Sequence, residues 1–157
     1  RTPLHDPKAV GVLFGLRLEH TKGDIYRALL EGVAYGIRHN LEVMEQEQVR
    51  PARILAVGGG TKNRLWMGIV SDACGVQLHI PAQQIGASYG DAFLAGRGIG
   101  LFQSLADIRQ WVTIREVVQP DTRDRPVYDF HYALFRELYL ATRSLMHRLS
   151  DYIAGEA

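Results

Sequence analysis

The sequence predicts an α/β fold with at least partly parallel strands, and three observations support it. Short apolar runs at residues 54–57 and 76–81 are too brief for globular helices and suit strands. Longer stretches with an apolar residue every three or four positions separate these runs and suit helices. A glycine triplet, Gly58, Gly59 and Gly60, joins the first run to a helix. Alternating strands and helices indicate parallel strands, and ligands then gather at the carboxyl ends of those strands.

The composition is that of an ordinary soluble globular domain. Its 157 residues are the length of one domain and can bury a core. Lys and Arg number 18 against 17 Asp and Glu, and no basic stripe occurs, which argues against nucleic acid or an anionic membrane as partner. No run approaches the ~20 apolar residues of a membrane span. The single cysteine, Cys74, fits a reducing cytoplasm and is interpreted as a packed core thiol.

The first fifty residues predict a strand followed by a long helix. Residues 10–18 are rich in β-branched and aromatic side chains with glycines, which is typical of one or two bent strands. Thr21 and Asp24 form a capping-box pattern, so a helix begins there and continues to about Gln48. Its apolar stripe, which recurs every three or four residues, comprises Ile25, Leu29, Val33, Ile37, Leu41 and Met44. A second stripe, predicted to lie against another backbone rather than a flat ligand, comprises Ala28, Gly32 and Gly36.

The glycine triplet predicts a backbone surface that a ligand can approach. Glycine has no Cβ to block a close approach, and the start of the next helix presents free amide groups. Thr61 is placed to cap that helix with its hydroxyl. One face of the helix carries Leu65, Trp66, Ile69, Val70 and Ala73. A nucleotide is the functional interpretation, and a tight strand-to-helix turn without a ligand is the alternative that a lone triplet favours.

A second close-approach helix is predicted after the strand at 76–81, which ends at a proline. Ser88 is placed to cap this helix, which covers residues 86–96 with small residues along one face. Ser104 and Asp107 form another capping-box pattern, which opens a short helix that ends near Trp111.

The last part of the chain predicts a loop and a long helix. Residues 119–126 are polar and bounded by prolines, so they form the loop. The helix covers about 127–153. Its apolar stripe, interpreted as core or interface, comprises Tyr128, Tyr132, Phe135, Leu138, Leu145, Leu149 and Tyr152.

No catalytic or metal-binding group stands out among these residues. The six histidines include no pair three or four residues apart, and nothing resembles a Cys/His zinc set. Neither the lysine-containing phosphate loop nor the dinucleotide glycine fingerprint has its spacing at the triplet. No serine-hydrolase elbow occurs. The residues alone therefore predict a binding surface without a catalytic group.

Four segments, in order, resemble the carboxyl-terminal part of the FGGY family of carbohydrate kinases, and most of all its xylulose kinase branch. The first joins Arg1-Thr2-Pro3 and Asp6-Pro7 to residues 11–16, and the second is residues 24–35 of the long helix. The third is the glycine triplet with Trp66 and Asp72, and the fourth is residues 86–92. The resemblance covers nearly the whole chain, and four segments in order are a strong signal.

This resemblance implies part of an actin-like ATPase (ribonuclease H-like) domain, with residues 1–157 in the nucleotide-binding half of a sugar kinase. The family transfers the γ-phosphoryl group of ATP to a sugar or polyol hydroxyl, here that of a ketose such as D-xylulose. By carry-over, Gly58, Gly59 and Gly60 lie against the nucleotide, and Asn63 lies near its base or ribose. Magnesium is implied by ATP chemistry, with no ligand for it in this chain.

The family's catalytic aspartate, sugar-binding residues and phosphate loop are expected upstream of Arg1, so this chain alone is expected to be inactive. Its implied partners are ATP and a sugar bound through the missing domain, with no nucleic acid or membrane, and a homo-oligomer is left open. Lys62 and Arg64 are interpreted as solvated surface rather than phosphate contacts. Two positions depart from the family: Gly68 replaces a common Gln, which implies a looser site, and Asp91 stands where alanine is frequent, near the nucleotide wall or as a helix cap.

Three other interpretations stay open. Gluconate, ribulose or glycerol can replace xylulose, because the resemblance places sugar selectivity mainly in the missing domain. An actin-like module that binds a nucleotide without catalysis is a second interpretation. A truncated remnant of the fold is the third, and it would expose apolar surface and self-associate.

Overall fold

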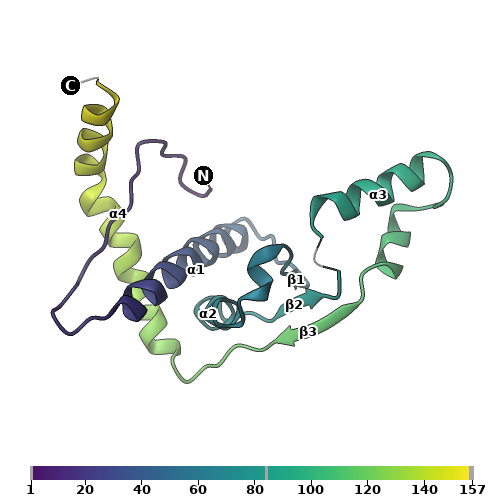
Figure 1. Cartoon of the computed structure of the whole chain (residues 1–157), viewed down its shortest axis with the longest axis horizontal. Helices are drawn as coiled ribbons and strands as arrows, with labels where there is room; N and C mark the ends of the chain where they lie inside the picture. Colours follow the sequence, from purple (N-terminus) through teal and green to yellow (C-terminus); the bar gives the residue numbers. More distant parts are fainter. Residues whose placement is uncertain (1, 84, 156–157) are drawn as a thin grey trace. The chain divides into compact units, whose positions relative to one another are not determined.

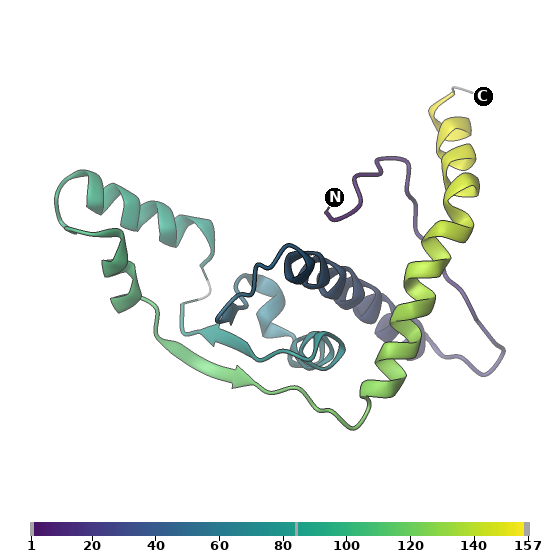
Figure 2. The ribbon, with the colours of Figure 1, turned by 180° about the vertical axis from the view of Figure 1, so that it is seen from behind.

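A computed structural model describes residues 2–83 and 85–155, and in it the chain forms two compact units (Figure 1 and Figure 2). Unit 1 combines the residues up to Arg50 with those from Arg123 onward. Unit 2 is the continuous segment Pro51–Thr122. None of the helices in the described ranges is both long enough and apolar enough to cross a bilayer.

Two long helices form unit 1, α1 (Lys22–Gln46) and α4 (Arg125–Ala154). The predicted capping box of α1 is confirmed, because the Asp24 amide donates to Thr21 Oγ1 at 3.4 Å and the Thr21 amide donates to the Asp24 carboxylate at 2.7 Å. The predicted final helix is also confirmed and begins two residues early. Pro126 lies in its first turn, where no amide donor is needed.

Tyr35 is the centre of the packing between α1 and α4. Its side chain is 5% exposed, and its ring centroid lies 6.5, 5.9 and 5.6 Å from those of Tyr128, Tyr132 and Phe135. The Arg38 guanidinium lies 4.2 Å from the Tyr132 ring centroid and so covers the edge of this cluster. The first half of the predicted aromatic stripe of α4 is therefore core.

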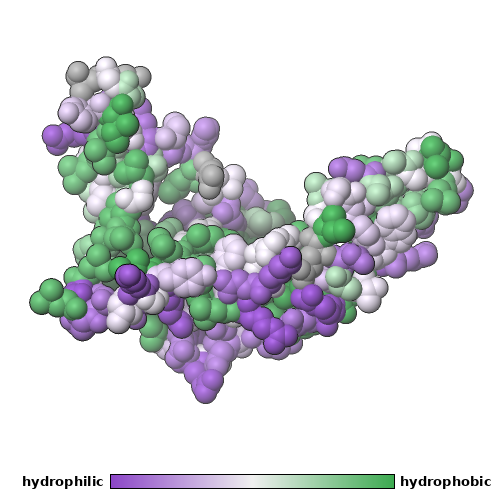
Figure 3. All heavy atoms as spheres, in the orientation of Figure 1, coloured by the Kyte–Doolittle hydropathy of each residue, from purple (hydrophilic) through white to green (hydrophobic). Residues whose placement is uncertain are grey.

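The apolar stripe of α1 is largely exposed, and the buried residues of the helix lie on another face. Leu29 and Val33 are 56% and 52% exposed, whereas the buried residues of α1 are Ala34, Tyr35 and His39. Periodicity identifies an apolar face, but the aromatic rings of α4 decide which face is covered in unit 1. In the second half of α4 the predicted stripe is also exposed, and Figure 3 shows hydrophobic atoms along it. The exposed stripe residues there are Leu145, Leu149 and Tyr152.

Two further predictions for unit 1 are wrong. Residues 10–18 form bends and turns instead of a strand, because a strand needs a neighbour for its amides and carbonyls and none of the described segments supplies one. Gly15, with φ +79°, also bends the chain there. The backbone packing predicted at Gly32 and Gly36 is not found among the described residues, since a Cβ at either position would meet nothing within 4 Å, and the alternative of a flat ligand stays a prediction.

The segment before these bends is fixed to α4 by Asp6. Its carboxylate accepts a hydrogen bond from the Tyr139 hydroxyl at 2.7 Å and lies 2.8 Å from His147 Nε2. Lys8 forms an ion pair with Asp151, next to Ser150, whose hydroxyl donates to the Lys8 carbonyl at 2.8 Å. The hydrogen bonds from His147 and then Tyr139 lower the pKa of Asp6 from 3.8 to about 2.

Replacing Asp6 with asparagine is expected to destabilise unit 1 at neutral pH and to have little effect near pH 2. The folded-state pKa of Asp6 is depressed, so its stabilising contribution is present above the ordinary value of 3.8 and is lost as the pH falls towards about 2. Thermal melting followed by circular dichroism across this range measures the difference between the two proteins. Asp91→Asn, at an exposed position of unit 2, is the control. A difference in melting temperature that stays constant with pH would contradict the role of the Asp6 charge.

The sheet of unit 2 contains β1 (Ile54–Leu55), β2 (Leu78–Pro81) and β3 (Ile114–Val118), in that order. β1 and β2 are parallel, with Ile54 opposite Leu78, and β3 is antiparallel to β2. The predicted α/β class and parallel pair are therefore confirmed. The predicted strand 54–57 is shorter than expected, and its residue Leu55 is exposed, so the strand is not fully buried. β3 lies outside the predicted strands, although three of its five residues, Ile114, Val117 and Val118, are β-branched.

The helices of unit 2 are α2 (Arg64–Cys74) and α3 (Ala87–Gly98), with 3-10 helices η1 (Gly59–Lys62) and η2 (Leu105–Gln110). α2 buries Ile69, Val70 and Ala73 as predicted, while Leu65 on the predicted face is exposed. Cys74 is half-buried at the end of α2, so it is not fully in the core.

The predicted cap of α3 is wrong, and the predicted cap of η2 is confirmed. Ser88 is not the cap of α3, because the helix begins one residue earlier, after Gly86, without a side-chain hydrogen bond. The capping box of Ser104 and Asp107 is confirmed at the start of η2.

Aromatic rings join α3 to η2, which lie side by side in Figure 1. Phe93 is 1% exposed, and its ring stacks on Phe102 with a centroid distance of 4.7 Å. Trp111 meets both rings edge-on, at 5.7 Å and 5.0 Å. A Cβ at Gly96 would lie 2.6 Å from the Phe102 ring, so at this one position α3 needs a small residue, as predicted.

Candidate functional site

The glycine triplet leaves the sheet at the carboxyl end of β1. Since β1 and β2 are parallel, the carboxyl end of β2 at Pro81 lies at the same edge of the sheet. Ligands of open α/β sheets collect at this edge. The structure therefore places the triplet where the sequence predicts a binding surface.

The three glycines of the triplet have different structural roles. Gly58 has φ +90° and ψ −177°, a backbone conformation that is essentially restricted to glycine. At Gly60, a Cβ would lie 2.4 Å from Cζ3 of Trp66. At Gly59, a Cβ would meet nothing within 4 Å. Gly58 and Gly60 therefore set the shape of the turn, and Gly59 is its open position.

Hydrogen bonds close the turn as η1. The Gly58 carbonyl accepts from the Thr61 amide at 3.2 Å and from the Thr61 hydroxyl at 2.7 Å. The Gly60 carbonyl accepts from the Asn63 amide at 3.0 Å. Thr61 is buried, and its hydrogen bonds to the Gly58 carbonyl hold the two ends of the turn together.

Asn63, not Thr61, is the N-cap of α2, which corrects the prediction for Thr61. The Asn63 side-chain oxygen accepts from the Trp66 amide at 3.1 Å. The η1 turn includes Gly59 and Gly60 and continues to Lys62, so α2 begins at Arg64, two residues later than a Thr61 cap requires. Asparagine is among the strongest N-cap residues, and this preference is the sequence signal for the true cap.

The charged side chains near the turn are structural or solvated. Lys62 is exposed, and Arg64, whose side chain is 85% exposed, reaches Glu116 at 3.7 Å. Asp72 accepts the Asp121 amide at 2.7 Å and so ties α2 to the segment after β3. Asp91 lies exposed beyond the first turn of α3, which corrects its interpretation as a helix cap.

Gly68, which stands where the family commonly has glutamine, leaves room on α2. A Cβ there would meet nothing within 4 Å, so no described neighbour fills the place of the missing side chain. In the described ranges, no three His, Cys, Asp or Glu side chains are grouped to hold a metal ion.

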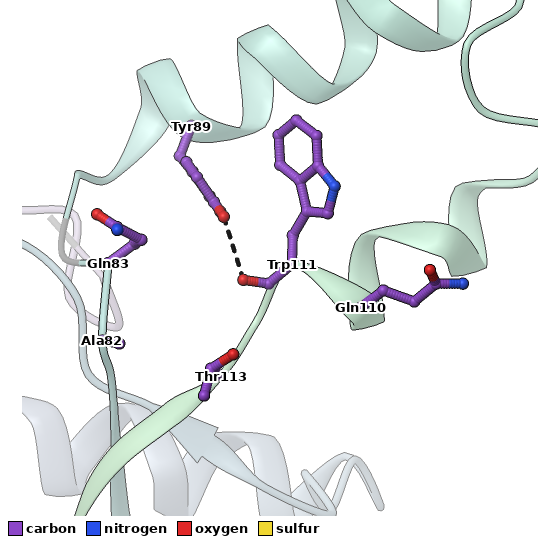
Figure 4. Close-up of a pocket in the computed structure, with 6 residues that line it drawn as sticks. All are labelled: Ala82, Gln83, Tyr89, Gln110, Trp111 and Thr113. Carbon is purple, nitrogen blue, oxygen red and sulfur yellow. Dashed lines mark hydrogen bonds between the residues drawn. The ribbon is translucent and has the colours of Figure 1, made fainter.

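A hollow of about 460 Å³ lies beyond the carboxyl end of β2 (Figure 4). Ala82, Gln83 and Tyr89 line one part of it, and Gln110, Trp111 and Thr113 line the other. The Tyr89 hydroxyl already donates to the Trp111 carbonyl at 3.1 Å, and the Gln110 side chain points away from the others. The polar groups of this hollow therefore do not converge on one point.

Comparisons with known proteins show which family the chain belongs to. A family model, the FGGY family of carbohydrate kinases, C-terminal domain, matches residues 1–99. A xylulose kinase of Staphylococcus epidermidis is 30% identical over 146 residues, which are 92% of this chain and 29% of the relative. Glycerol kinase 2 of Saccharolobus solfataricus is 38% identical over 118 residues, which are 74% of this chain and 24% of the relative.

Among solved structures, the xylulose kinase from Rhodospirillum rubrum matches with a TM-score of 0.79 and 37% identity. The match covers 90% of this chain and 29% of that one. The chain thus spans less than a third of the length of these relatives. Because the family model matches well over half of its residues, including the glycine turn and its helix, the chain belongs to the FGGY family of carbohydrate kinases and corresponds to their C-terminal domain.

Proposed function

We propose that this chain supplies the ATP-binding surface of a carbohydrate kinase whose acceptor is a ketose such as D-xylulose. The observation that carries the proposal is the glycine turn at the carboxyl end of β1. Two of its glycines fix its shape and the third, Gly59, leaves backbone open to a ligand. A flat ligand such as adenosine can approach such a backbone closely because no side chain intervenes.

The proposed role of the chain is positioning. Phosphoryl transfer depends mainly on holding the donor and stabilising charge. Gly58, Gly59 and Gly60 would lie against the nucleotide, and Asn63, at the start of α2, would lie near the base or ribose. ATP supplies the phosphoryl group when it is bound.

Catalytic and sugar-binding groups are proposed to lie outside residues 1–157. Asp72, the acidic residue of α2, is bound to the Asp121 amide and so is not placed to act as a base. Magnesium belongs to the proposal through ATP chemistry, and no residue of this chain is assigned to it.

The choice of xylulose is supported by relatives named as xylulose kinases, one of them solved. A relative named as a glycerol kinase has a higher identity over a shorter match, which keeps a polyol acceptor as the alternative. Because these matches lie in the nucleotide half by our proposal, they bear weakly on the acceptor.

Two measurements test the proposal. Calorimetric titration of the chain with magnesium-ATP and with ADP is expected to show competitive binding. The protein that carries this chain is expected to phosphorylate D-xylulose in preference to ribulose, gluconate and glycerol, and the chain alone is expected to phosphorylate none. Absence of nucleotide binding both by the chain alone and by the protein that carries it would refute the ATP-binding role. Binding without phosphorylation of any acceptor would instead favour a non-catalytic nucleotide-binding module.

A further inference from the structure

We propose that Trp66 is a positioning residue for the nucleotide, because its indole ring lies on Gly60 and holds the turn in the shape that leaves Gly59 open. This inference rests on the proposed function and assigns to the site a residue that does not itself touch the ligand. Trp66 acts through the backbone of the turn.

The Trp66 ring lies close to Gly60 and to neither of the other two glycines of the triplet. A Cβ on Gly60 would meet three atoms of the six-membered ring: Cζ3 at 2.4 Å, Cε3 at 3.1 Å and Cη2 at 3.4 Å. No real Cβ tolerates the shortest of these distances, so ring and turn fit together only with glycine at position 60. The neighbouring Gly59 has no such contact and stays open.

A second connection joins the same residues through hydrogen bonds. The Trp66 amide donates to the Asn63 side chain at 3.1 Å, and the Asn63 amide donates to the Gly60 carbonyl at 3.0 Å. Trp66 is therefore linked to Gly60 both through its ring and through Asn63. Any movement of the turn away from the ring would strain the start of α2 as well.

Shape, and not a hydrogen bond of the indole, carries this interaction. Trp66 Nε1 is buried, yet it has no hydrogen-bond partner in the described part of the chain. A phenylalanine at position 66 loses no described hydrogen bond, but it lacks the outer part of the indole that carries Cζ3 and Cη2 and so keeps only part of the contact with Gly60. A leucine removes the flat surface and frees space above the turn.

The test compares four variants of the protein that carries this chain: Gly60→Ala, Trp66→Leu, their combination, and Trp66→Phe. Gly60→Ala and Trp66→Leu are each expected to raise the KM for ATP roughly tenfold while the KM for the sugar stays unchanged. The KM for ATP of the double variant is expected to be no higher than that of the more impaired single variant, because leucine makes room for the new methyl group. Trp66→Phe, which keeps a flat ring without the outer indole atoms, is expected to have a KM for ATP between those of the natural protein and Trp66→Leu.

A matched control and a second readout keep the outcome clear. Leu65→Ala changes an exposed neighbour on the same helical turn and is expected to leave both KM values unchanged. In a Trp111→Phe background, Trp66 is the one remaining tryptophan of this chain, so ATP binding is expected to change its emission. Circular dichroism verifies that each variant is folded.

Three results would overturn the inference: Trp66→Leu with an unchanged KM for ATP, strictly additive effects in the double variant, or Trp66→Phe more impaired than Trp66→Leu. If Trp66→Leu does not fold, Gly60→Ala carries the test alone, and an unchanged KM for ATP in that variant refutes the inference. Failure of the proposed function is distinguishable, because the natural protein itself would then bind no ATP.

Discussion

Replacing Phe93 with alanine is expected to lower the free energy of unfolding of unit 2 by about 3–5 kcal/mol. The Phe93 side chain is fully buried, stacked on Phe102 and met edge-on by Trp111. Its removal leaves a cavity between α3 and η2 that the neighbouring rings cannot fill without leaving their own contacts. Urea denaturation followed by circular dichroism measures the change.

Leu94→Ala is the matched control for this substitution. Leu94 is the next residue of α3 and is 57% exposed, so its truncation is expected to change the free energy of unfolding by less than about 0.5 kcal/mol. Equal losses in the two variants would show that the aromatic cluster does not hold α3 in place.

Gly58→Ala is expected to destabilise unit 2 by about 1–3 kcal/mol and to weaken nucleotide binding. With φ +90° and ψ −177°, residue 58 has a conformation that alanine adopts only under strain. The turn must then either keep its shape at that energetic cost or rearrange, and rearrangement displaces the open backbone at Gly59. Thermal melting and ATP titration of the same preparation separate the two effects.

Gly68→Ala adds the same methyl group within α2 and serves as the comparison for stability. The added Cβ would meet nothing within 4 Å at this helical position. Alanine is expected to stabilise the helix by up to about 1 kcal/mol there. A Gly58→Ala variant as stable as the natural protein, with unchanged affinity for ATP, would contradict the strain at the turn.

Local signals account for most of the elements that the sequence predicts correctly. The capping boxes at Thr21 and Ser104 satisfy amides only three residues away, so the sequence alone defines them. Periodicity likewise locates α1, α2 and α4 to within a few residues. Contacts between distant segments are not encoded in this way. The strand predicted at 10–18 is wrong because strand formation depends on a partner elsewhere in the fold, and β3 forms because β2 lies beside it.

The candidate site shows the same division. The spacing of the triplet predicts a turn after β1, and the resemblance predicts that Asn63 lies near the base or ribose of the nucleotide. The separate roles of the three glycines depend on φ at Gly58 and on the position of the Trp66 ring over Gly60, and neither follows from sequence spacing. The occupancy of the turn by a nucleotide stays a prediction, as do the cytoplasmic location and the oligomeric state.

The division of the chain into units has a consequence for its synthesis. Unit 1 needs both early and late residues: its hydrogen bond of 3.2 Å between Arg27 and the Tyr128 hydroxyl joins positions 101 residues apart. Unit 2 is continuous and is complete once Thr122 has left the ribosome. A nascent chain can therefore fold unit 2 while α1 still waits for α4. The glycine turn, which lies in unit 2, can thus take its shape before α4 is synthesised and before Tyr35 meets its aromatic partners.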